Sequence, residues 1–501
     1  MISHKKKIII IGAGVAGLSA GCYAQMSGFQ TQIFEKHDKP GGLCTSWQRN
    51  GYTIDGCIHW LVGSSPSSAF YKFWEEIGAV QEKEFVYFDE YLNYETEDGK
   101  NLSFSTNLDI LRENMINFAP EDKDQIDSFI NFSKKLIDFQ QPLEKPPELY
   151  TLNDGLKLIS KIAPFLNLMR SLSKISISDF ASRFKNQHLK NLFLRLWFPE
   201  FSLFFLSLTL TWLHKKEAGY PIGGSFSFAK GIEKRYLELG GKINYNSPVK
   251  KILIKDDKAI GVELENGTKH YSDIVISASD LYKTIFKLLE GKYVDEKIKK
   301  LFDMPIFPPL LYISLGVNRT FKDLPYSIEG FDISLKKSIK IDNKYENRMR
   351  VRIHNFDPTL SPQGKTLITI AFNSNYDYWR KLYDIKDEYK KEKNRIFEEI
   401  LYNLDYKFPK ITNDIEIWDI ATPITFERYT ENYKGSFEGW LLTPKNFNVI
   451  IPRKFMKLKN FYISGHWTLL GGGLPSALIS SRWTIQLICH DNKIKFMEVA
   501  K

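Results

Sequence analysis

Near the N-terminus, a short apolar run leads directly into a glycine-rich turn. Four consecutive isoleucines occupy 8–11, glycines punctuate 12–17, and an Ala- and Ser-rich stretch follows at 18–26. An unbroken apolar run of this length predicts a strand buried on both faces of a parallel sheet. The stretch after the turn predicts a helix, and the apolar residues of 31–34 predict a second strand.

The rest of the chain alternates between this sheet rhythm and two long departures from it. Short strands separated by turn signals predict an antiparallel meander over 242–271, and 273–278 predicts a returning core strand. The stretches 64–219 and 301–455 lack the regular strand–helix alternation and indicate insertions. Further predicted helices are 124–139, 226–239, 387–404 and 477–489, and further predicted strands are 310–317, 349–354, 366–372 and 460–464.

Together these elements predict an α/β fold with two domains. The first is a Rossmann-like, dinucleotide-binding domain with a parallel sheet and a β-meander, made of residues 1–63, 220–300 and 456–501. The second is an α+β substrate domain made of the two insertions, 64–219 and 301–455.

The spacing of the first glycines predicts a dinucleotide site. Gly12 permits a tight turn, Gly14 allows the backbone to approach a pyrophosphate, and Gly17 allows the helix to pack closely on the strand. The pyrophosphate would lie at the helix N-terminus, where free N–H groups favour an anion. Glu35 ends the second strand at the distance expected for binding ribose hydroxyls, and its charge disfavours a 2′-phosphate.

Composition narrows the setting of the protein. The chain has 501 residues, of which 43% are hydrophobic, so two closely joined domains with large cores are expected. Its four cysteines show no CxxC spacing, which indicates neither a disulfide framework nor a metal site and favours a reducing compartment. The net charge of +10 is compatible with an anionic membrane surface, and equally with the bias of a lysine-rich proteome. We expect no nucleic-acid partner.

The N-terminus resembles a secretion signal, because Lys5, Lys6 and Lys7 precede the apolar stretch 8–21. That stretch, however, carries the glycine fingerprint at the correct spacing. We therefore expect no signal peptide and predict a cytoplasmic protein. A second apolar segment raises the alternative of peripheral contact with the inner face of a membrane.

This second segment is 201–213, which is too short to span a bilayer of about 30 Å. Three interpretations are open: a core helix, the wall of an apolar tunnel, or a helix that inserts into one face of a membrane. The last of these would make it a membrane-contacting helix.

With these motifs in hand, the chain resembles the phytoene desaturase, carotenoid isomerase and retinol saturase group of the amine oxidase-like FAD superfamily. The resemblance rests on 12–17 with Glu35, on Asp55-Gly56 with His59, on 423–439, and on Gly465 with 471–475. It implies an FAD cofactor. Leu43 and Cys44 follow the Gly41-Gly42 pair where many amine oxidases have an arginine, which is closer to the carotenoid and retinoid branch.

The resemblance also implies site residues. For the cofactor these are Gly12, Gly14, Ala16, Gly17, Glu35, Lys36, Gly41, Gly42, Leu43, Val249, Ser277, Gly465, Gly472, Gly473, Leu474 and Pro475. His59, Glu427, Tyr429 and His466 are the candidates for catalysis. A core position is an equal alternative for His59, and an ion pair with Arg428 is the alternative for Glu427.

We therefore predict an FAD-dependent oxidoreductase that acts on carbon–carbon bonds of a hydrophobic isoprenoid or other lipid. The reaction would be desaturation, saturation or cis–trans isomerisation of a carotenoid- or retinoid-like molecule. A flavin amine oxidase and a non-catalytic, flavin-bearing lipid-binding protein are the alternatives. No second glycine fingerprint follows a predicted strand, so a quinone, oxygen, a reductase or the substrate itself is expected to exchange electrons with the flavin.

Overall fold

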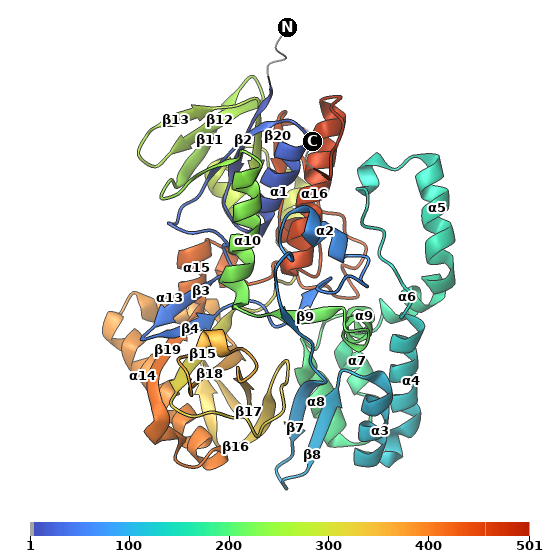
Figure 1. Cartoon of the computed structure of the whole chain (residues 1–501), viewed down its shortest axis with the longest axis vertical. Coiled ribbons are helices and arrows are strands. Elements are labelled where there is room, and N and C mark those ends of the chain that lie inside the picture. Colours follow the sequence, from blue (N-terminus) through green and yellow to red (C-terminus); the bar gives the residue numbers. More distant parts are fainter. Residues whose placement is uncertain (1–4, 456, 500–501) are drawn as a thin grey trace.

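The run of isoleucines lies at the centre of a five-stranded parallel sheet (Figure 1). The computed structural model describes residues 5–455 and 457–499, so positions 1–4, 456 and 500–501 of the predicted first domain lie outside the described residues. The strand order is β10-β2-β1-β14-β20. The bounds are β1 Lys7–Ile11, β2 Gln30–Phe34, β10 Lys242–Asn244, β14 Ile274–Ser277 and β20 Phe461–Ile463.

Both faces of this sheet are covered, which explains why β1 is apolar throughout. Ile8 and Ile10 pack in one core with three helices, α1 (Val15–Met26), α10 (Gly224–Glu238) and α16 (Gly473–Asp491). Ile9 and Ile11 point to the other face and pack against a three-stranded antiparallel sheet. That sheet consists of β11 Val249–Lys255, β12 Lys258–Leu264 and β13 Lys269–Tyr271.

The α/β fold class is confirmed, with one correction to the meander. Residues 242–244 form β10, which pairs in parallel with β2 instead of joining the antiparallel strands. Its pairing places Ile243 beside Ile33 in the parallel sheet, and a strand of three residues carries too little alternation to reveal which sheet it joins.

A second sheet of seven strands unites the two insertions. Its order is β19-β15-β18-β17-β16-β7-β8, and β16 pairs in parallel with β7. The first insertion supplies β7 Glu90–Glu95 and β8 Asn101–Ser105. The second supplies β15 Leu310–Val317, β16 Phe331–Ile341, β17 Lys344–Ile353, β18 Thr366–Asn373 and β19 Ile415–Ala421. Two helices of the second insertion, α13 (Tyr376–Tyr383) and α14 (Lys386–Lys407), accompany this sheet.

The remaining part of the first insertion is mainly helical. Its helices are α2 Tyr71–Glu76, α3 Leu108–Phe118, α4 Lys123–Lys135, α5 Leu152–Ile162, α6 Leu166–Leu172, α7 Ile177–Ala181, α8 Gln187–Leu196 and α9 Leu203–His214. Figure 1 shows α5 standing apart from the body of the molecule, with a long loop before it and α6 close after it. Smaller elements complete the fold: β3 Ser46–Arg49, β4 Tyr52–Asp55, β5 Leu61–Val62, β6 Phe85–Val86, β9 Ala218–Pro221, α11 Leu281–Lys283, α12 Glu296–Leu301 and α15 Pro423–Thr430.

The apolar segment 201–213 is a core helix. Within α9, nine of the twelve residues are buried, among them Leu206, Leu208 and Leu210. The prediction of a membrane-contacting helix at 201–213 is therefore wrong, because its apolar side chains are already covered by the protein. Among the helices in the part of the chain that the structure describes, none combines the length and the apolar character needed to cross a bilayer.

Candidate active site

The two glycine-rich turns, at opposite ends of the sequence, line one cavity of about 1130 Å³. The strands that precede them, β1 and β20, lie in the same parallel sheet with β14 between them. Because parallel strands end at the same edge, both turns open toward the same side of the sheet. From there the cavity continues between the two insertions.

The N-terminal turn has the geometry of an anion site. Helix α1 begins after Gly14 without a side-chain cap and without an acidic residue in its first turn, and Val15 and Ala16 of that turn line the cavity. Gly17 lies against the strand end: a Cβ there would stand 1.9 Å from the carbonyl oxygen of Gly12. Its predicted role in close helix–strand packing agrees with this contact, although Gly17 itself does not line the cavity.

Glu35 holds the end of β2 against this turn. Its carboxylate accepts hydrogen bonds from the backbone N–H of Ala13 at 2.6 Å and of His37 at 2.9 Å. The next loop reaches the same place, because the N–H of Gly41 donates to the carbonyl of Ala13 at 2.9 Å. The cavity is lined here by Glu35, Lys36, Gly41, Gly42, Leu43 and Val249.

The C-terminal turn brings a second helix end to the cavity. Helix α16 begins after Gly472, again with no side-chain cap and no acidic residue in its first turn. Two uncapped helix N-termini in one cavity favour a ligand with negative or electron-rich groups at two separated points. Gly12, Gly14 and Ala16 would hold the pyrophosphate of a dinucleotide, and Gly465 and the turn of Gly472, Gly473, Leu474 and Pro475 would hold the ring system.

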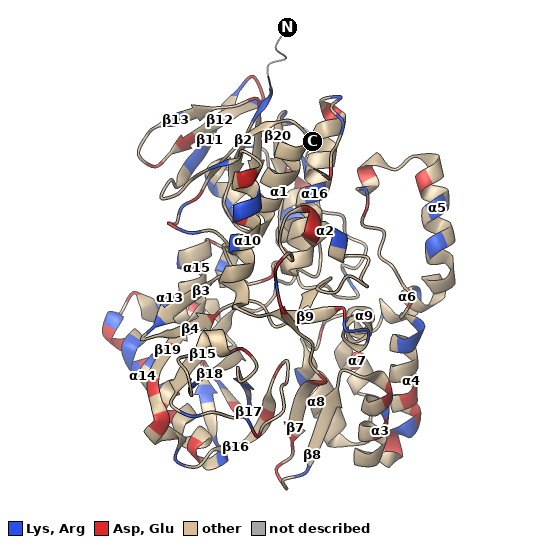
Figure 2. Ribbon diagram, in the orientation of Figure 1, with Lys and Arg blue, Asp and Glu red and all other residues tan. Residues whose placement is uncertain are grey.

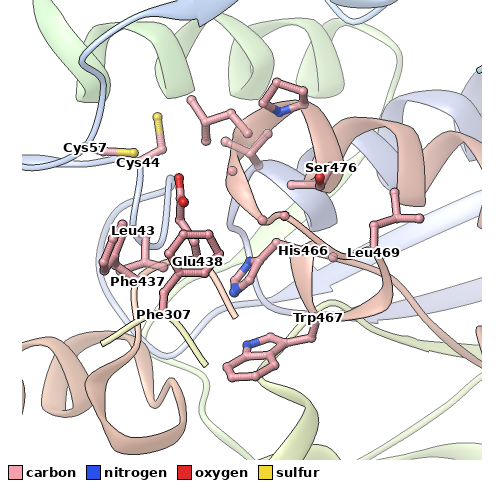
Figure 3. Close-up of a pocket in the computed structure, with 18 of the residues that line it drawn as sticks. Leu43, Cys44, Cys57, Phe307, Phe437, Glu438, His466, Trp467, Leu469 and Ser476 are labelled. Carbon is pink, nitrogen blue, oxygen red and sulfur yellow. The ribbon is translucent and has the colours of Figure 1, made fainter. Parts of the chain in front are cut away.

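Two half-buried side chains face the cavity beside this C-terminal turn, Glu438 and His466 (Figure 3). Burial raises the pKa of the Glu438 carboxyl to about 8. Burial also lowers the pKa of the His466 imidazole to about 4. The Nε2 atom of His466 is buried without a hydrogen-bond partner in the part of the chain that the structure describes, as expected of an atom that meets a ligand.

Glu438 is held directly against the turn. A Cβ on Gly472 would lie 2.3 Å from the backbone carbonyl oxygen of Glu438, and a Cβ on Gly473 would lie 3.5 Å from its Oε1. A larger residue at Gly472 would therefore displace Glu438. Its carboxyl group stands at the N-terminus of α16, where the ring system of a flavin would lie.

His59 lies on another wall, where a charged cluster fixes its position. Its Nδ1 is 2.6 Å from Oε1 of Glu329, and the other carboxylate oxygen accepts from Arg350 at 3.3 Å. Burial disfavours the carboxylate, but His59 and Arg350 outweigh it and lower the pKa of Glu329 to about 2. Arg352 donates to the carbonyl of His59 at 3.4 Å. This imidazole is therefore held by an ion-pair network.

The other two candidates for catalysis are placed elsewhere. Glu427 does not line the cavity: its carboxylate accepts from the hydroxyl of Tyr376 at 2.8 Å, outside the site. Tyr429 lines the cavity but is half exposed and lies beside His37, at the end of β2. Ser277, predicted to bind the cofactor, is buried and bonded to Thr284 at 2.7 Å, and its successors Ala278 and Ser279 line the cavity instead.

The far part of the cavity is an aromatic chamber. Phe307 and Phe437 pack with ring centroids 5.5 Å apart, and Trp60 stacks on Trp197 at 6.0 Å. Helix α9 forms part of the wall through Phe204, Phe205, Thr209 and Trp212, so the tunnel-wall interpretation of 201–213 holds together with the core interpretation. Such a chamber suits a long apolar ligand.

Comparison with known proteins assigns the chain to a family. The family model described as flavin containing amine oxidoreductase matches residues 15–484. The chain belongs to this family of flavin-containing amine oxidoreductases. Its members bind a flavin, which agrees with the two glycine turns and the orphaned Nε2 of His466.

Among curated members, the chain is similar to carotenoid enzymes. It is 26% identical to prolycopene isomerase 1 of an Oncidium hybrid cultivar, over 86% of this chain and 74% of the relative. It is 25% identical to a 1-hydroxycarotenoid 3,4-desaturase of Flavobacterium, over 97% of this chain and 100% of the relative. The resemblance to the carotenoid branch of this flavoprotein superfamily is confirmed.

Amine-oxidising members are similar in fold. The solved structure of cyclohexylamine oxidase from Brevibacterium oxydans superimposes with a TM-score of 0.60 at 13% identity, covering 98% of this chain and 100% of that one. At this identity the likeness shows the shared architecture and carries no information on the substrate.

Sequence reasoning missed Glu438, Glu329 and Arg350. Glu438 lies one residue before Gly439 within a segment already noted for its resemblance, but a lone glutamate gives no sign of burial. Glu329 and Arg350 lie in the second insertion, about 270 and 290 residues after His59, and no local pattern announces that they meet it. They meet His59 only once the second insertion is folded against residues 1–63 of the first domain.

Proposed function

We propose that this chain is an FAD-dependent oxidoreductase that acts on carbon–carbon bonds of a long, hydrophobic, carotenoid- or retinoid-like isoprenoid. The observation that carries the proposal is one cavity that joins a dinucleotide site to a buried aromatic chamber. The similarity to two carotenoid enzymes, an isomerase and a desaturase, supports the substrate class.

The length of the cofactor site supports FAD in particular. Glu35 and Val249 line the cavity beyond the pyrophosphate turn, on the side away from the C-terminal turn that would receive the ring system. A mononucleotide would leave these two positions without a role. An adenosine would place its ribose near Glu35 and its adenine near the backbone of Val249.

Bound FAD supplies hydride or electron transfer, and the protein supplies position, dryness and the accompanying proton. Near pH 7 Glu438 is mainly a neutral acid and His466 a neutral base, because burial disfavours the charged form of each. Removing two hydrogens from a carbon–carbon bond releases one hydride and one proton, and His466 can accept that proton. Adding them requires a proton donor, which Glu438 is. Isomerisation needs no net proton.

Spectroscopy of the purified protein tests the cofactor. We expect a yellow protein whose chromophore, released by denaturation, has the mass of FAD. A colourless protein that takes up no FAD, or one that releases only FMN, would contradict the proposal.

Anaerobic titration separates the three reactions. If oxidised enzyme is bleached by a more saturated polyene such as phytoene, the enzyme desaturates. If reduced enzyme is reoxidised by an unsaturated polyene, it saturates. If a cis-polyene such as prolycopene is converted to its trans isomer with no net change in flavin absorbance, it isomerises. No response to any polyene, together with hydrogen peroxide release from simple amines, would instead favour an amine oxidase.

We also propose that the flavin exchanges electrons with a quinone, oxygen or a reductase. As the location we propose a reducing compartment, at the inner face of a membrane. The state of the cysteines supports the reducing compartment. The four cysteines, Cys22, Cys44, Cys57 and Cys489, are free thiols, as a reducing compartment favours. Flavin reduction by NADH alone, at a rate that matches turnover, would rule out this choice of electron partners.

A further inference from the structure

Helix α5 presents an apolar face that no part of the described chain covers. Leu152, Leu156 and Ile159 are spaced by four and three residues, so they lie on one side of the helix. Their exposed fractions are 90%, 67% and 60%. None of the eleven residues of α5 is buried. Large aliphatic side chains this exposed on one face indicate a contact surface.

The helix is nevertheless well defined at its start. The side chain of Thr151 accepts a hydrogen bond from the N–H of Asp154, and the carboxylate of Asp154 accepts from the N–H of Thr151 at 2.8 Å. This capping box favours the helix at its first turn. An eleven-residue helix with no buried face is marginal in water, so a partner for its apolar face would add the missing support.

Parts of α5 and α6 also line the cavity. Leu158 and Ile162 of α5 line the cavity, as does Met169 of α6. One side of α5 therefore belongs to the substrate chamber, while the side with Leu156 and Ile159 faces outward. The same helix separates the chamber from the exterior, and its two apolar sides are continuous around the helix.

A second exposed apolar segment is connected to the same region. Ile450 is 78% exposed, in the loop that also contains Phe447. Phe447 packs on Phe204 of α9 with ring centroids 5.8 Å apart, and Phe204 packs on Phe139 at 5.8 Å. Phe139 in turn packs on Phe165, just after α5, at 5.3 Å. One aromatic cluster thus supports both exposed apolar segments.

The charged side chains of α5 and α6 indicate which kind of partner would bind this apolar face. Lys157 and Lys161 of α5, Arg170 of α6 and Lys174 are exposed. None of the four forms an ion pair with another residue within 5–455 and 457–499. Figure 2 shows Lys or Arg positions in blue along α5. The acid of this helix, Asp154, is paired with Lys145 at 2.7 Å. Apolar side chains beside unpaired cations fit the headgroup and acyl boundary of an anionic bilayer, and the chain's net charge of +10 agrees.

We propose that α5 and α6 form a membrane-docking surface, by which the protein lies on an anionic lipid bilayer and draws its apolar substrate under α5 into the chamber. The docking rests on the exposed face itself, and the entry route rests in addition on the proposed function. A lipid substrate would then pass from acyl chains to aromatic walls without crossing water, which apolar molecules resist entering.

Vesicle flotation tests the docking without reference to any reaction. Flavin-loaded full-length protein is mixed with vesicles of phosphatidylcholine alone or with added phosphatidylglycerol. We expect flotation with the anionic vesicles, weakening as salt is raised. L156E and I159E should each reduce vesicle affinity by about tenfold or more, because a charge replaces an inserted aliphatic group. K157E and K161E should remove most of the dependence on phosphatidylglycerol.

The matched control is L237E, the same chemical change at an exposed leucine of α10 that is 47% accessible. It should float like the unchanged protein. Equal flotation of L156E and the unchanged protein would overturn the docking surface. Light scattering that shows a dimer broken by L156E would overturn it as well, since a second copy of the chain would then cover α5. For the entry route, L156E should slow turnover of substrate embedded in vesicles and leave turnover in detergent unchanged. Equal slowing in both would overturn that route.

Discussion

At the scale of single residues, the site is governed by burial rather than by paired charges. Glu438 and His466 are both enclosed, and enclosure disfavours the charged form of an acid and of a base alike. Near pH 7, Glu438 is thereby kept as a neutral acid and His466 as a neutral base. His59 differs, because Glu329 and Arg350 surround it with charge.

The first prediction concerns Glu438. Its pKa of about 8 means that the acid form is lost as pH rises through 8. In the saturating direction, which consumes a proton, the rate should fall above pH 8. Glu438→Gln should lower that rate by about 100-fold and abolish the alkaline fall, because the amide neither titrates nor donates a proton to carbon.

The matched control is Glu427→Gln. The Glu427 carboxylate accepts a hydrogen bond from Tyr376 outside the cavity. The rate of the saturating reaction should therefore change by less than about threefold, and its fall above pH 8 should persist. An unaltered pH profile in Glu438→Gln would show that this carboxyl does not supply the proton.

The second prediction concerns His466 and stability. Its folded pKa of about 4 lies below the ordinary value of 6.5. The contribution to stability is therefore complete above pH 6.5 and is lost as pH falls toward 4. Between pH 7 and 5 this loss is on the order of 2 kcal/mol. His466→Gln should remove this pH-dependent loss. The free energy of unfolding, measured in urea on flavin-free protein, should therefore decline less between pH 7 and 5 in the variant than in the unchanged protein.

His490 provides the control, since it is an exposed histidine in the last turn of helix α16. His490→Gln should follow the unchanged protein at both pH values. If His466→Gln and the unchanged protein lose the same free energy between pH 7 and 5, the imidazole is not buried as described.

At the scale of elements, the turn between β1 and α1 depends on one close approach. Gly17→Ala would place a methyl group 1.9 Å from the carbonyl oxygen of Gly12, so α1 must move away from the strand end. We expect a loss of stability of about 2 kcal/mol or more and a clear loss of bound flavin. Thermal melting and flavin content at saturating FAD measure both.

Gly155→Ala is the comparison, because a Cβ at Gly155 meets nothing within 4 Å. In the middle of a helix this change should be neutral or stabilise by up to about 1 kcal/mol. Normal flavin content in Gly17→Ala would contradict the role assigned to the turn.

Elements with a strong local pattern could be predicted from the sequence, and those defined by partners could not. The isoleucine run of β1 could be predicted because both faces of the strand are buried, and β11 and β12 could be predicted because turn signals separate them. β16 is exposed at Lys336 and Lys337, in the middle of the strand, so its pattern is interrupted. The segment 201–213 reads as apolar in either a core or a membrane, and only its neighbours decide between them.

At the scale of the whole molecule, the cofactor end of the site could be predicted better than the reacting end. The cofactor residues follow two turns with fixed spacing, and fourteen of the sixteen predicted positions line the cavity, all except Gly17 and Ser277. The reacting end is assembled from both insertions, across the seven-stranded sheet and the helices around α9, together with His59 and His466 of the first domain. Contacts such as His59 with Glu329 arise from that assembly, and no spacing in the sequence encodes them.

The most direct test of the central claim is product analysis after anaerobic incubation of the FAD-loaded protein, once with oxidised and once with chemically reduced flavin, with phytoene and with prolycopene, using the flavin-free protein as the blank. Chromatography with absorbance detection should show a polyene with a changed number or geometry of conjugated double bonds, only when FAD is bound, and less of it with Glu438→Gln if the reaction consumes a proton. Recovery of both polyenes unchanged from a fully FAD-loaded protein, in vesicles and in detergent alike, would contradict the account.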